Sequence, residues 1–178
     1  MGMTFDTLKN LLDTEQLNYF IHPNAPAAMF RINGKNGSLG FIVSLQMDGD
    51  FLKVAASDYA KCPLDSPHLL ALFRLLNELN TGIRWIKWSW DFRNGDILVE
   101  GDMWVMDNQP TQKQFRRMLE NIIPSLDEQL PRIKQVIQTG QEPDVNPTPP
   151  PSLRRSTPCS FINKMSFNCQ SDFRKQKA

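Results

Sequence analysis

The chain contains 178 residues, of which 40% are apolar and 22% are charged, so it is long enough for one domain with a hydrophobic core and too short for two full domains. Its 20 Lys and Arg residues nearly balance 19 Asp and Glu, and this formal net charge of +1 excludes the strong overall basicity of proteins that bind bulk phosphate. No apolar run approaches the roughly 20 residues that a membrane-spanning helix needs, so we expect a soluble protein with no membrane partner.

The N-terminus and the cysteines indicate the cellular compartment. Residues 1–6 lack the basic flank and apolar segment of a signal peptide, which predicts a cytoplasmic protein. Cys62, Cys159 and Cys169 are odd in number and widely spaced, which favours reduced thiols over a disulfide framework. Because none belongs to a CxxC pair and only 2 histidines accompany them, we predict no metal site and no cofactor.

The composition changes sharply near Gly140, which divides the chain. Residues 141–178 contain 6 of the 13 prolines and lose the apolar periodicity, so they cannot offset the entropy of their own ordering. We predict a domain over residues 1–140, with 14 basic and 16 acidic side chains, and a disordered Pro-rich tail over 141–178, with 6 basic and 3 acidic. The tail leaves open a short docking segment formed by Phe161, Ile162, Met165, Phe167 and Phe173.

The first elements of the domain follow from a change of periodicity. Apolar residues at helical spacing over 5–12 predict an amphipathic helix of about three turns, and a short extended piece follows at 18–22. Alternating residues over 29–56 then predict a three-stranded antiparallel meander. If Asp48-Gly49 forms a two-residue turn, Val43 faces Val54 on the buried side.

A Leu-rich helix is predicted next. Ser66 can cap its first amides, Pro67 suits the first helical position, and Gly82 suits a left-handed cap at its end. Residues 69–79 are apolar round most of the helix, so more than one side must be covered. The second cover is either the core of the domain or a second subunit, and the latter predicts a homodimer.

A Trp-rich hairpin over residues 83–106 carries the predicted binding surface. A type I′ turn at Asn94-Gly95 would place Trp88 opposite Gly101 on the apolar face, with Gly101 leaving room for the indole, and Trp90 and Phe92 on that same face. On the opposite, polar face this register pairs Trp85 with Trp104 and Lys87 with Asp102. Either a helix covers that tryptophan pair or it anchors a partner. The residues predicted to bind a partner are Trp85, Trp104, Lys87, Asp102 and Leu98.

The last predicted element is a broken helix. Thr111 and Gln114 fit a capping box at its start. Pro124 is expected to interrupt it, and Ser125 with Glu128 can form a second capping box that restarts it. The second piece is expected to end near Gly140.

The predicted order is helix, three strands, helix, two strands, helix, which is an α+β fold with an antiparallel sheet of about five strands and helices packed on one side. Three segments of this pattern resemble the YbjN family, and the resemblance extends over roughly residues 4 to 138. The segments are Leu75-Leu76-Asn77-Glu78-Leu79-Asn80, Pro110-Thr111-Gln112-Lys113-Gln114-Phe115 and Leu130-Pro131-Arg132-Ile133, with the hairpin from Trp88 to Val105 between the first two. The resemblance implies the fold of type III secretion chaperones and a role in binding other proteins, often as a dimer, with no catalytic residues to carry over.

Two other functions compete with protein binding as interpretations of the hairpin. The acids between Asp91 and Asp107 could serve a small enzyme or hold a divalent cation, but alternation and the expected Lys87 partner favour solvent-facing charge. Basic residues interleaved with the tryptophans could bind a single-stranded nucleic acid, but alternation separates the two kinds of side chain. We therefore predict a non-enzymatic protein-binding module, a chaperone-like or regulatory adaptor, that binds no nucleic acid.

Overall fold

A computed structural model describes residues 2–106 and 109–143 of the chain. It has three α-helices and seven strands, and one short 3₁₀ turn, η1, lies between the third and fourth strands. In chain order the elements are α1 (Phe5–Thr14), β1 (Tyr19–Ile21), β2 (Ala27–Asn33), β3 (Ser38–Gln46), η1 (Met47–Gly49), β4 (Phe51–Ser57), β5 (Ala60–Lys61), α2 (Leu69–Gly82), β6 (Ile86–Trp90), β7 (Asp96–Trp104) and α3 (Gln112–Thr139).

All strands belong to one antiparallel sheet, as the sequence predicts. The order runs β1-β2-β3-β4-β7, and β6 pairs with the other edge of β7. The short β5 continues the line of β4 along β7. The strand count is higher than the predicted five because β1 and β5, of three and two residues, are too short to show an alternating pattern. The expected extended piece at 18–22 contains β1.

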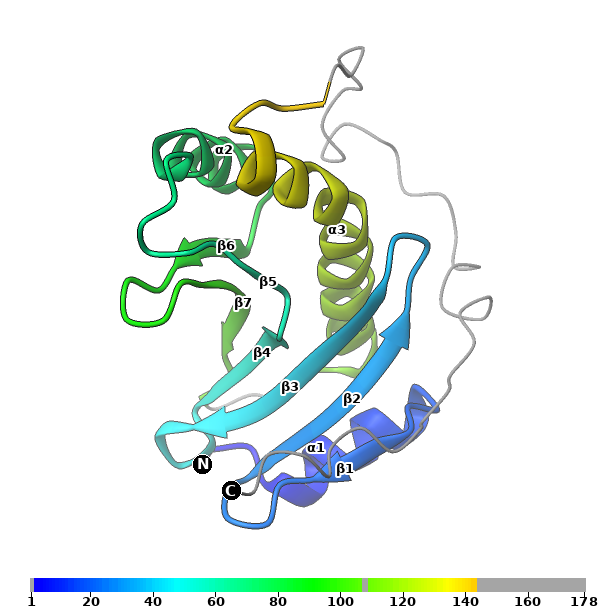
Figure 1. Ribbon diagram of the computed structural model, residues 1–178. Helices are drawn as coiled ribbons and strands as arrows, with labels where there is room; N and C mark the ends of the chain where they lie inside the picture. Colours follow the sequence, from blue (N-terminus) through cyan, green and yellow to red (C-terminus); the bar gives the residue numbers. More distant parts are fainter. Residues whose placement is uncertain (1, 107–108, 144–178) are drawn as a thin grey trace.

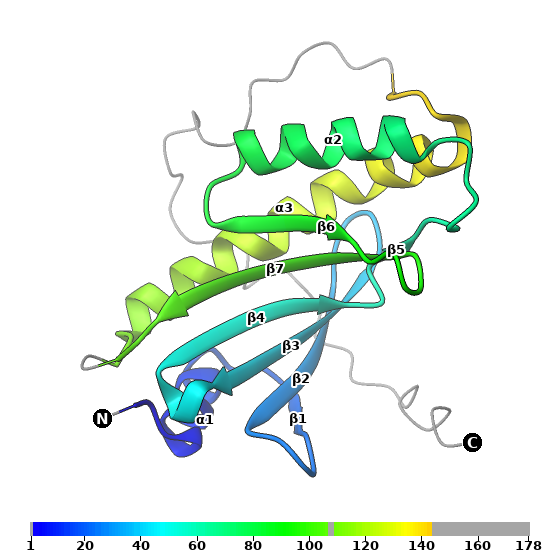
Figure 2. The ribbon, with the colours of Figure 1, turned by 90° about the vertical axis from the view of Figure 1, so that its left-hand side faces the viewer.

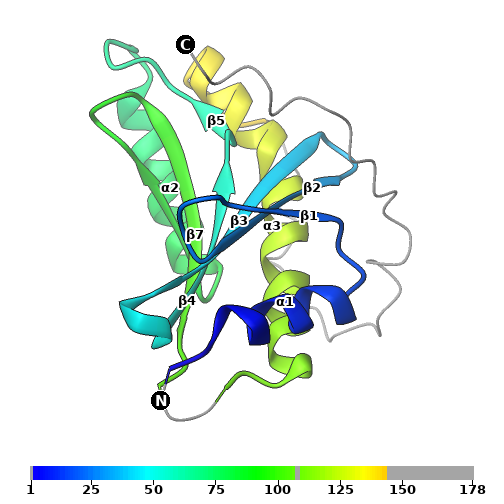
Figure 3. The same ribbon diagram turned by 90° about the horizontal axis from the view of Figure 1, so that it is seen from below.

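The helices cover one face of the sheet (Figures 1 and 2). Seen from below, α1 lies beside α3 on this covered side (Figure 3). Alternate strand residues point into the resulting core, where Phe30 stacks on Phe41 with ring centroids 5.3 Å apart. Their strand neighbours Met29 and Ile42 are only partly buried. The sheet therefore has a covered inner face and an outer face that none of the described helices covers.

The hairpin between β3 and β4 has the predicted register. Val43 lies opposite Val54, and the two-residue turn is Asp48-Gly49, with φ of 55° and 90°. These positive values are what a type I′ turn requires. The amide of Asp50 closes the turn on the carbonyl oxygen of Met47 at 3.1 Å.

The boundaries of α2 differ from the prediction at both ends. The helix begins at Leu69 after His68, two positions later than predicted, although the Ser66 hydroxyl accepts from the His68 amide as a capping side chain would. At the other end Gly82 lies inside the helix and is not left-handed. The chain instead leaves α2 through extended Ile83, and a positive φ occurs three residues after Gly82, at Trp85.

The predicted break in the last helix is wrong, because α3 runs unbroken through Pro124 and Pro131. A proline has no N–H, so Pro131 leaves the carbonyl of Asp127 without its helical donor. Asn36 Nδ2, in the loop between β2 and β3, donates to that carbonyl at 3.0 Å. At Pro131 a tertiary contact thus replaces the hydrogen bond that the helix cannot make. The predicted capping box at Thr111 and Gln114 is present, and the helix ends at left-handed Gly140 as expected.

The carboxylate of Asp127 anchors the same loop to α3. It is buried and accepts from the amides of Lys35 and Asn36, each at 2.8 Å. At the neighbouring residue of α3, the hydroxyl of Tyr59 donates to the carbonyl oxygen of Leu126 at 2.8 Å. Burial, with a smaller contribution from the Asp127 charge, raises the pKa of Tyr59. The middle of α3 is therefore held against the sheet by polar contacts as well as by apolar packing.

Ion pairs link α3 to the other two helices. Arg116 Nε lies 3.0 Å from a carboxylate oxygen of the buried Glu15, which follows α1. Arg132 bonds Glu78 of α2 at 2.8 Å. In the segments that the structure describes, no helix is both long and apolar enough to cross a membrane. The predicted tail lies outside the described residues beyond position 143.

Candidate functional site

The hairpin of β6 and β7 positions the candidate site, and its register differs from the prediction by two residues. Trp90 pairs with Ile97 and Trp88 with Val99, so the connecting loop has four residues, 92–95. Gly95 has φ of 81°, but Asn94 does not have the positive φ that a type I′ turn needs. A shift of two residues preserves the faces of a strand, so most side chains keep their predicted side.

Local side-chain bonds stabilise the longer loop. The Asp91 carboxylate accepts from the Arg93 amide at 2.9 Å and from the Arg93 guanidinium at 2.7 Å. The Arg93 side chain, followed by its amide, lowers the pKa of Asp91 to about 2. Asn94 Oδ1 accepts from the amide of Asp96 at 3.0 Å. Asp and Asn thus use their side chains to fold the loop in a way that the Asn-Gly pair alone does not indicate.

Trp85 is the main exception to the predicted faces. Its φ of 75° is rare for a bulky residue, and it turns the indole to the inner face of the sheet. There the ring lies over Gly101, where an added Cβ would be 2.8 Å from the indole, and Nε1 donates to the carbonyl oxygen of Asp102 at 2.6 Å. The predicted Trp85–Trp104 pair is therefore wrong. Gly101 makes room for a tryptophan as predicted, but for Trp85 and not Trp88.

Trp104 does lie on the outer face. It pairs across the strands with Phe51, and the two rings meet edge to face with centroids 5.0 Å apart. The indole is still 59% exposed. Leu98 lies on the same face of β7 and is also exposed. It pairs with Ser89 of β6, whereas the predicted register pairs it with Asp91.

Two ion pairs lie between Leu98 and Trp104. Lys87 Nζ contacts Asp102 Oδ2 at 2.5 Å, and this bond raises the pKa of Lys87. The pair is diagonal, because Lys87 lies directly opposite Glu100. Glu100 in turn pairs with Lys53 of β4. We call the set Phe51, Lys53, Lys87, Leu98, Glu100, Asp102 and Trp104 the outer patch; it offers exposed apolar groups among charges that neutralise one another.

The acids of this hairpin do not converge on one point. Asp91 pairs with Arg93, Asp96 lies 3.5 Å from Lys61, and the other two acids of β7 have the lysine partners given above. Asp107 lies outside the described residues. Within residues 2–106 and 109–143, no three His, Cys, Asp or Glu side chains are close enough to hold a metal ion.

A second apolar surface lies on α2 and the hairpin loop. Leu70 and Phe73 on the solvent side of α2 are 63% and 44% exposed, and Phe73 packs edge to face on Trp90 at 5.5 Å. Phe92, predicted to be buried, is 74% exposed because it belongs to the loop and not to the strand. Trp90 is only partly buried and bonds the carbonyl oxygen of Cys62 at 3.1 Å. We call Leu70, Phe73, Trp90 and Phe92 the α2 patch.

The edge of β6 next to α2 is not open to another strand. Asn80 of α2 bonds both outward-pointing backbone groups of Trp88, through Oδ1 at 2.7 Å and Nδ2 at 2.9 Å. The side-chain amide stands where a neighbouring strand would bond. Sequence reasoning noticed Asn80 only as the residue near the end of a helix, since nothing in the pattern reports a contact across the hairpin.

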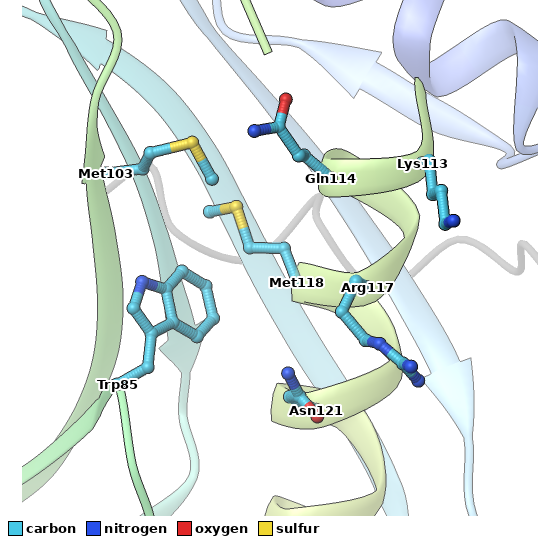
Figure 4. Close-up of a pocket in the computed structure, with 7 residues that line it drawn as sticks. All are labelled: Trp85, Met103, Lys113, Gln114, Arg117, Met118 and Asn121. Atoms are coloured by element: carbon cyan, nitrogen blue, oxygen red, sulfur yellow. The ribbon is translucent and has the colours of Figure 1, made fainter. Parts of the chain in front are cut away.

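A cavity of about 350 Å³ lies on the inner side, between the hairpin and the first turns of α3 (Figure 4). Trp85 and Met103 form its wall on the sheet side, and Met118 faces them from the helix. Gln114 and Asn121 flank Met118, with Lys113 and Arg117 at the outer side of the same helix. Sequence reasoning missed this cavity, because alternation assigns Trp85 to the other face.

The comparisons with known proteins agree with this architecture. The profile of the YbjN family, described as "Putative bacterial sensory transduction regulator", matches residues 4–135. The crystal structure of YbjN from E. coli, described as a "putative transcription regulator", is similar with a TM-score of 0.50 and 20% identity, over 76% of this chain and 89% of that one. A chain of the crystal structure of the ExsC–ExsE complex is similar with a TM-score of 0.50 and 12% identity, over 75% of this chain and 97% of that one.

No curated protein matches the sequence significantly. At these identities the two structures establish the fold, and the fold is the type III secretion chaperone-like arrangement that the sequence resemblance implied. The family profile spans most of the described domain, from the residue that caps α1 to the last turn but one of α3. The chain belongs to the YbjN family.

Proposed function

We propose that this protein is a non-enzymatic, protein-binding adaptor of the cytoplasm, chaperone-like or regulatory in its action, and that it works as a homodimer. The observation that carries the proposal is the exposed Trp104 beside Phe51 on the outer face of the sheet. Exposed tryptophans are the side chains that most often dominate the binding energy of protein interfaces. A similar fold in a chain of the ExsC–ExsE complex supports a protein as the partner.

The charges around Trp104 suit such a partner. Lys87 with Asp102 and Lys53 with Glu100 are already paired, so the outer patch has little net charge to attract a polyanion. The paired charges can form the polar rim of an interface whose centre is the aromatic pair. Binding across the face is favoured over strand addition at β6, because Asn80 occupies the backbone groups of Trp88.

The α2 patch supports self-association. Leu70 and Phe73 expose large apolar surface on a helix whose opposite side already packs in the core. A second copy of the same helix would cover both residues in a two-fold contact. The proposed domain of residues 1–140 contains both patches, so both proposed contacts belong to the domain. The cytoplasmic assignment is supported by the odd number and wide spacing of the cysteines, which favour reduced thiols, and by Cys62, which is a buried free thiol.

Two matched variants of the full chain test the two patches separately. Trp104→Ala removes the exposed indole of the outer patch, and Leu70→Glu places a charge in the α2 patch. Each variant is used to capture proteins from native lysate, and its mass in solution is measured by light scattering. We expect Trp104→Ala to lose a stoichiometric partner and stay dimeric, and Leu70→Glu to become monomeric.

Each variant is the control for the other, since both change one exposed apolar side chain. A partner that binds Trp104→Ala as well as the unchanged chain would contradict the role of the outer patch. An unchanged chain with a monomeric mass would contradict the homodimer. Circular dichroism checks that both variants fold, which their exposure at these positions favours.

A further inference from the structure

The backbone of Trp85 has a left-handed conformation that is unfavourable for a bulky residue. A left-handed backbone is disfavoured for a residue other than glycine. The conformation moves the indole from the outer to the inner face, and Gly101 is required there because its missing side chain leaves the space that the ring occupies. The left-handed backbone of Trp85 and the missing side chain of Gly101 therefore act together to place the indole on the inner face.

The result of that placement is a cavity wall and not a filled core. Trp85 and Met103 remain partly exposed, and about 350 Å³ stays open between them and α3. This volume lies at the lower end of the range of small-molecule sites, roughly 300–1,000 Å³. The hydrogen bond from the indole to the carbonyl oxygen of Asp102 fixes the wall in place. Backbone strain that persists beside an open cavity is typical of binding sites.

The lining indicates what kind of molecule would fit. An indole and the two thioethers of Met103 and Met118 offer polarisable apolar surface suited to an aromatic ring. Gln114 and Asn121 stand beside it on α3 (Figure 4). Lys113 and Arg117 lie on the outer side of the helix, with their charged ends turned away from Trp85 (Figure 4). The apolar end of a ligand would lie inside. A charged end at the rim would be met by Lys113 or Arg117, whose flexible side chains also line the cavity and would turn towards it.

The charges at the rim favour an anion. Arg117 pairs with Glu120 at 3.3 Å, but Lys113 makes no ion pair with any residue in the described part of the chain. Asp102 contributes only its backbone carbonyl on this side, because its carboxylate bonds Lys87 on the outer face. We propose that the cavity between Trp85 and α3 is a binding site for a small aromatic carboxylate, with the ring against Trp85, Met103 and Met118 and the carboxylate near Lys113. This site is independent of the proposed protein-binding function, since it lies on the opposite side of the sheet from Trp104.

The test uses the full chain and two probes of the same shape, the anion 1-naphthylacetate and the neutral 1-naphthylacetamide. The sequence contains 4 tryptophans, so a ¹H–¹⁵N spectrum shows one indole N–H signal for each. We expect 1-naphthylacetate to shift the Trp85 signal and leave that of Trp104 unchanged. Calorimetry is expected to give one site per chain and an affinity about fivefold higher for the carboxylate than for the amide.

Three variants locate the binding. Lys113→Ala is expected to remove the preference for the carboxylate, whereas Lys134→Ala, an exposed lysine farther along the same helix, is the matched control. Asn121→Phe places a ring at an exposed position on the rim of the cavity, where it is expected to weaken both probes about tenfold or more without disturbing the core.

Several results would overturn the proposal. They are no binding to the unchanged chain, binding that shifts Trp104 or Trp90 and not Trp85, and binding that survives Asn121→Phe unchanged. Equal affinity for the two probes would overturn the assignment of an anionic ligand. A cavity already filled by another segment of the full chain would also appear as no binding, and it would count against a small-molecule site.

Discussion

Asn80 holds the backbone of Trp88 through two hydrogen bonds, one in which its side-chain oxygen accepts and one in which its nitrogen donates. Both partners are main-chain groups on the outer edge of β6, so one side chain does the work of a neighbouring strand. We expect Asn80→Ala to lower the free energy of unfolding by about 1–2 kcal/mol, because Trp88 loses both partners. Urea unfolding measures the loss.

The control for this prediction is Asn77→Ala, an exposed Asn one turn earlier on the same helix. It is expected to change stability by less than about 0.5 kcal/mol. Asn80→Ala also opens the edge of β6, so we expect its mass in light scattering to rise with concentration more than that of Asn77→Ala. Equal stabilities for the two variants would show that water replaces Asn80 at no cost.

The positive φ of Trp85 makes an unusual prediction about two substitutions at one site. Alanine is strained at φ of 75°, whereas glycine is not. Trp85→Gly is therefore expected to be about 1 kcal/mol more stable than Trp85→Ala. At Trp104, in the extended strand β7, the order is expected to reverse. Thermal unfolding of the four variants decides, and alanine above glycine at position 85 would mean that the backbone there is not left-handed.

Gly101 and Trp85 are expected to depend on one another. A Cβ at position 101 would lie 2.8 Å from the indole, so Gly101→Ala is expected to cost about 1–3 kcal/mol. In a Trp85→Ala background the same change meets no indole, and most of that cost is expected to disappear. A double-mutant cycle of unfolding free energies measures the difference. Additive effects would place the Trp85 ring away from Gly101.

The loop of the second hairpin makes a prediction about pH. The pKa of Asp91 is lowered from 3.8 to about 2, chiefly by the side chain of Arg93. Because the folded state holds the carboxylate in its charged form, the contact contributes fully above the ordinary pKa and is lost as the pH falls from about 4 towards 2. We expect Arg93→Gln to bring the pKa of Asp91 back towards its usual value. An NMR titration of the carboxyl carbon checks this, and an unchanged low pKa in the variant would contradict the assigned cause.

Comparing the two hairpins shows what the sequence could and could not predict. Asp48-Gly49 adopts the expected two-residue turn, and alternation then places Val43 opposite Val54. Asn94-Gly95 has the same signature, but the carboxylate of Asp91 and the side chain of Asn94 stabilise a longer loop. Turn propensity is local, whereas the choice between two turns depends on side-chain bonds that pattern reasoning does not weigh.

The candidate sites divide in the same way. Trp104, Leu98, Lys87 and Asp102 lie on the predicted outer face, since an even shift of register preserves faces. Trp85 does not, because a single left-handed residue reverses the alternation, and no sequence pattern signals it. Pro124 likewise predicted a break in the last helix, but α3 continues through it. The binding roles of Trp104, Leu98, Lys87 and Asp102 stay predictions.

The contact between Asp127 and the loop of β2 and β3 also bears on the order of folding. Lys35 and Asn36 lie 92 and 91 positions before the carboxylate that accepts from their amides. During synthesis, the hairpin is complete long before its loop has this acceptor, and contacts across such separations form slowly. We therefore expect the amides of Lys35 and Asn36 to be protected from hydrogen exchange only when α3 is docked. The last helix of the domain thus supplies the acceptor that the loop of an early hairpin lacks until the chain has grown past Asp127.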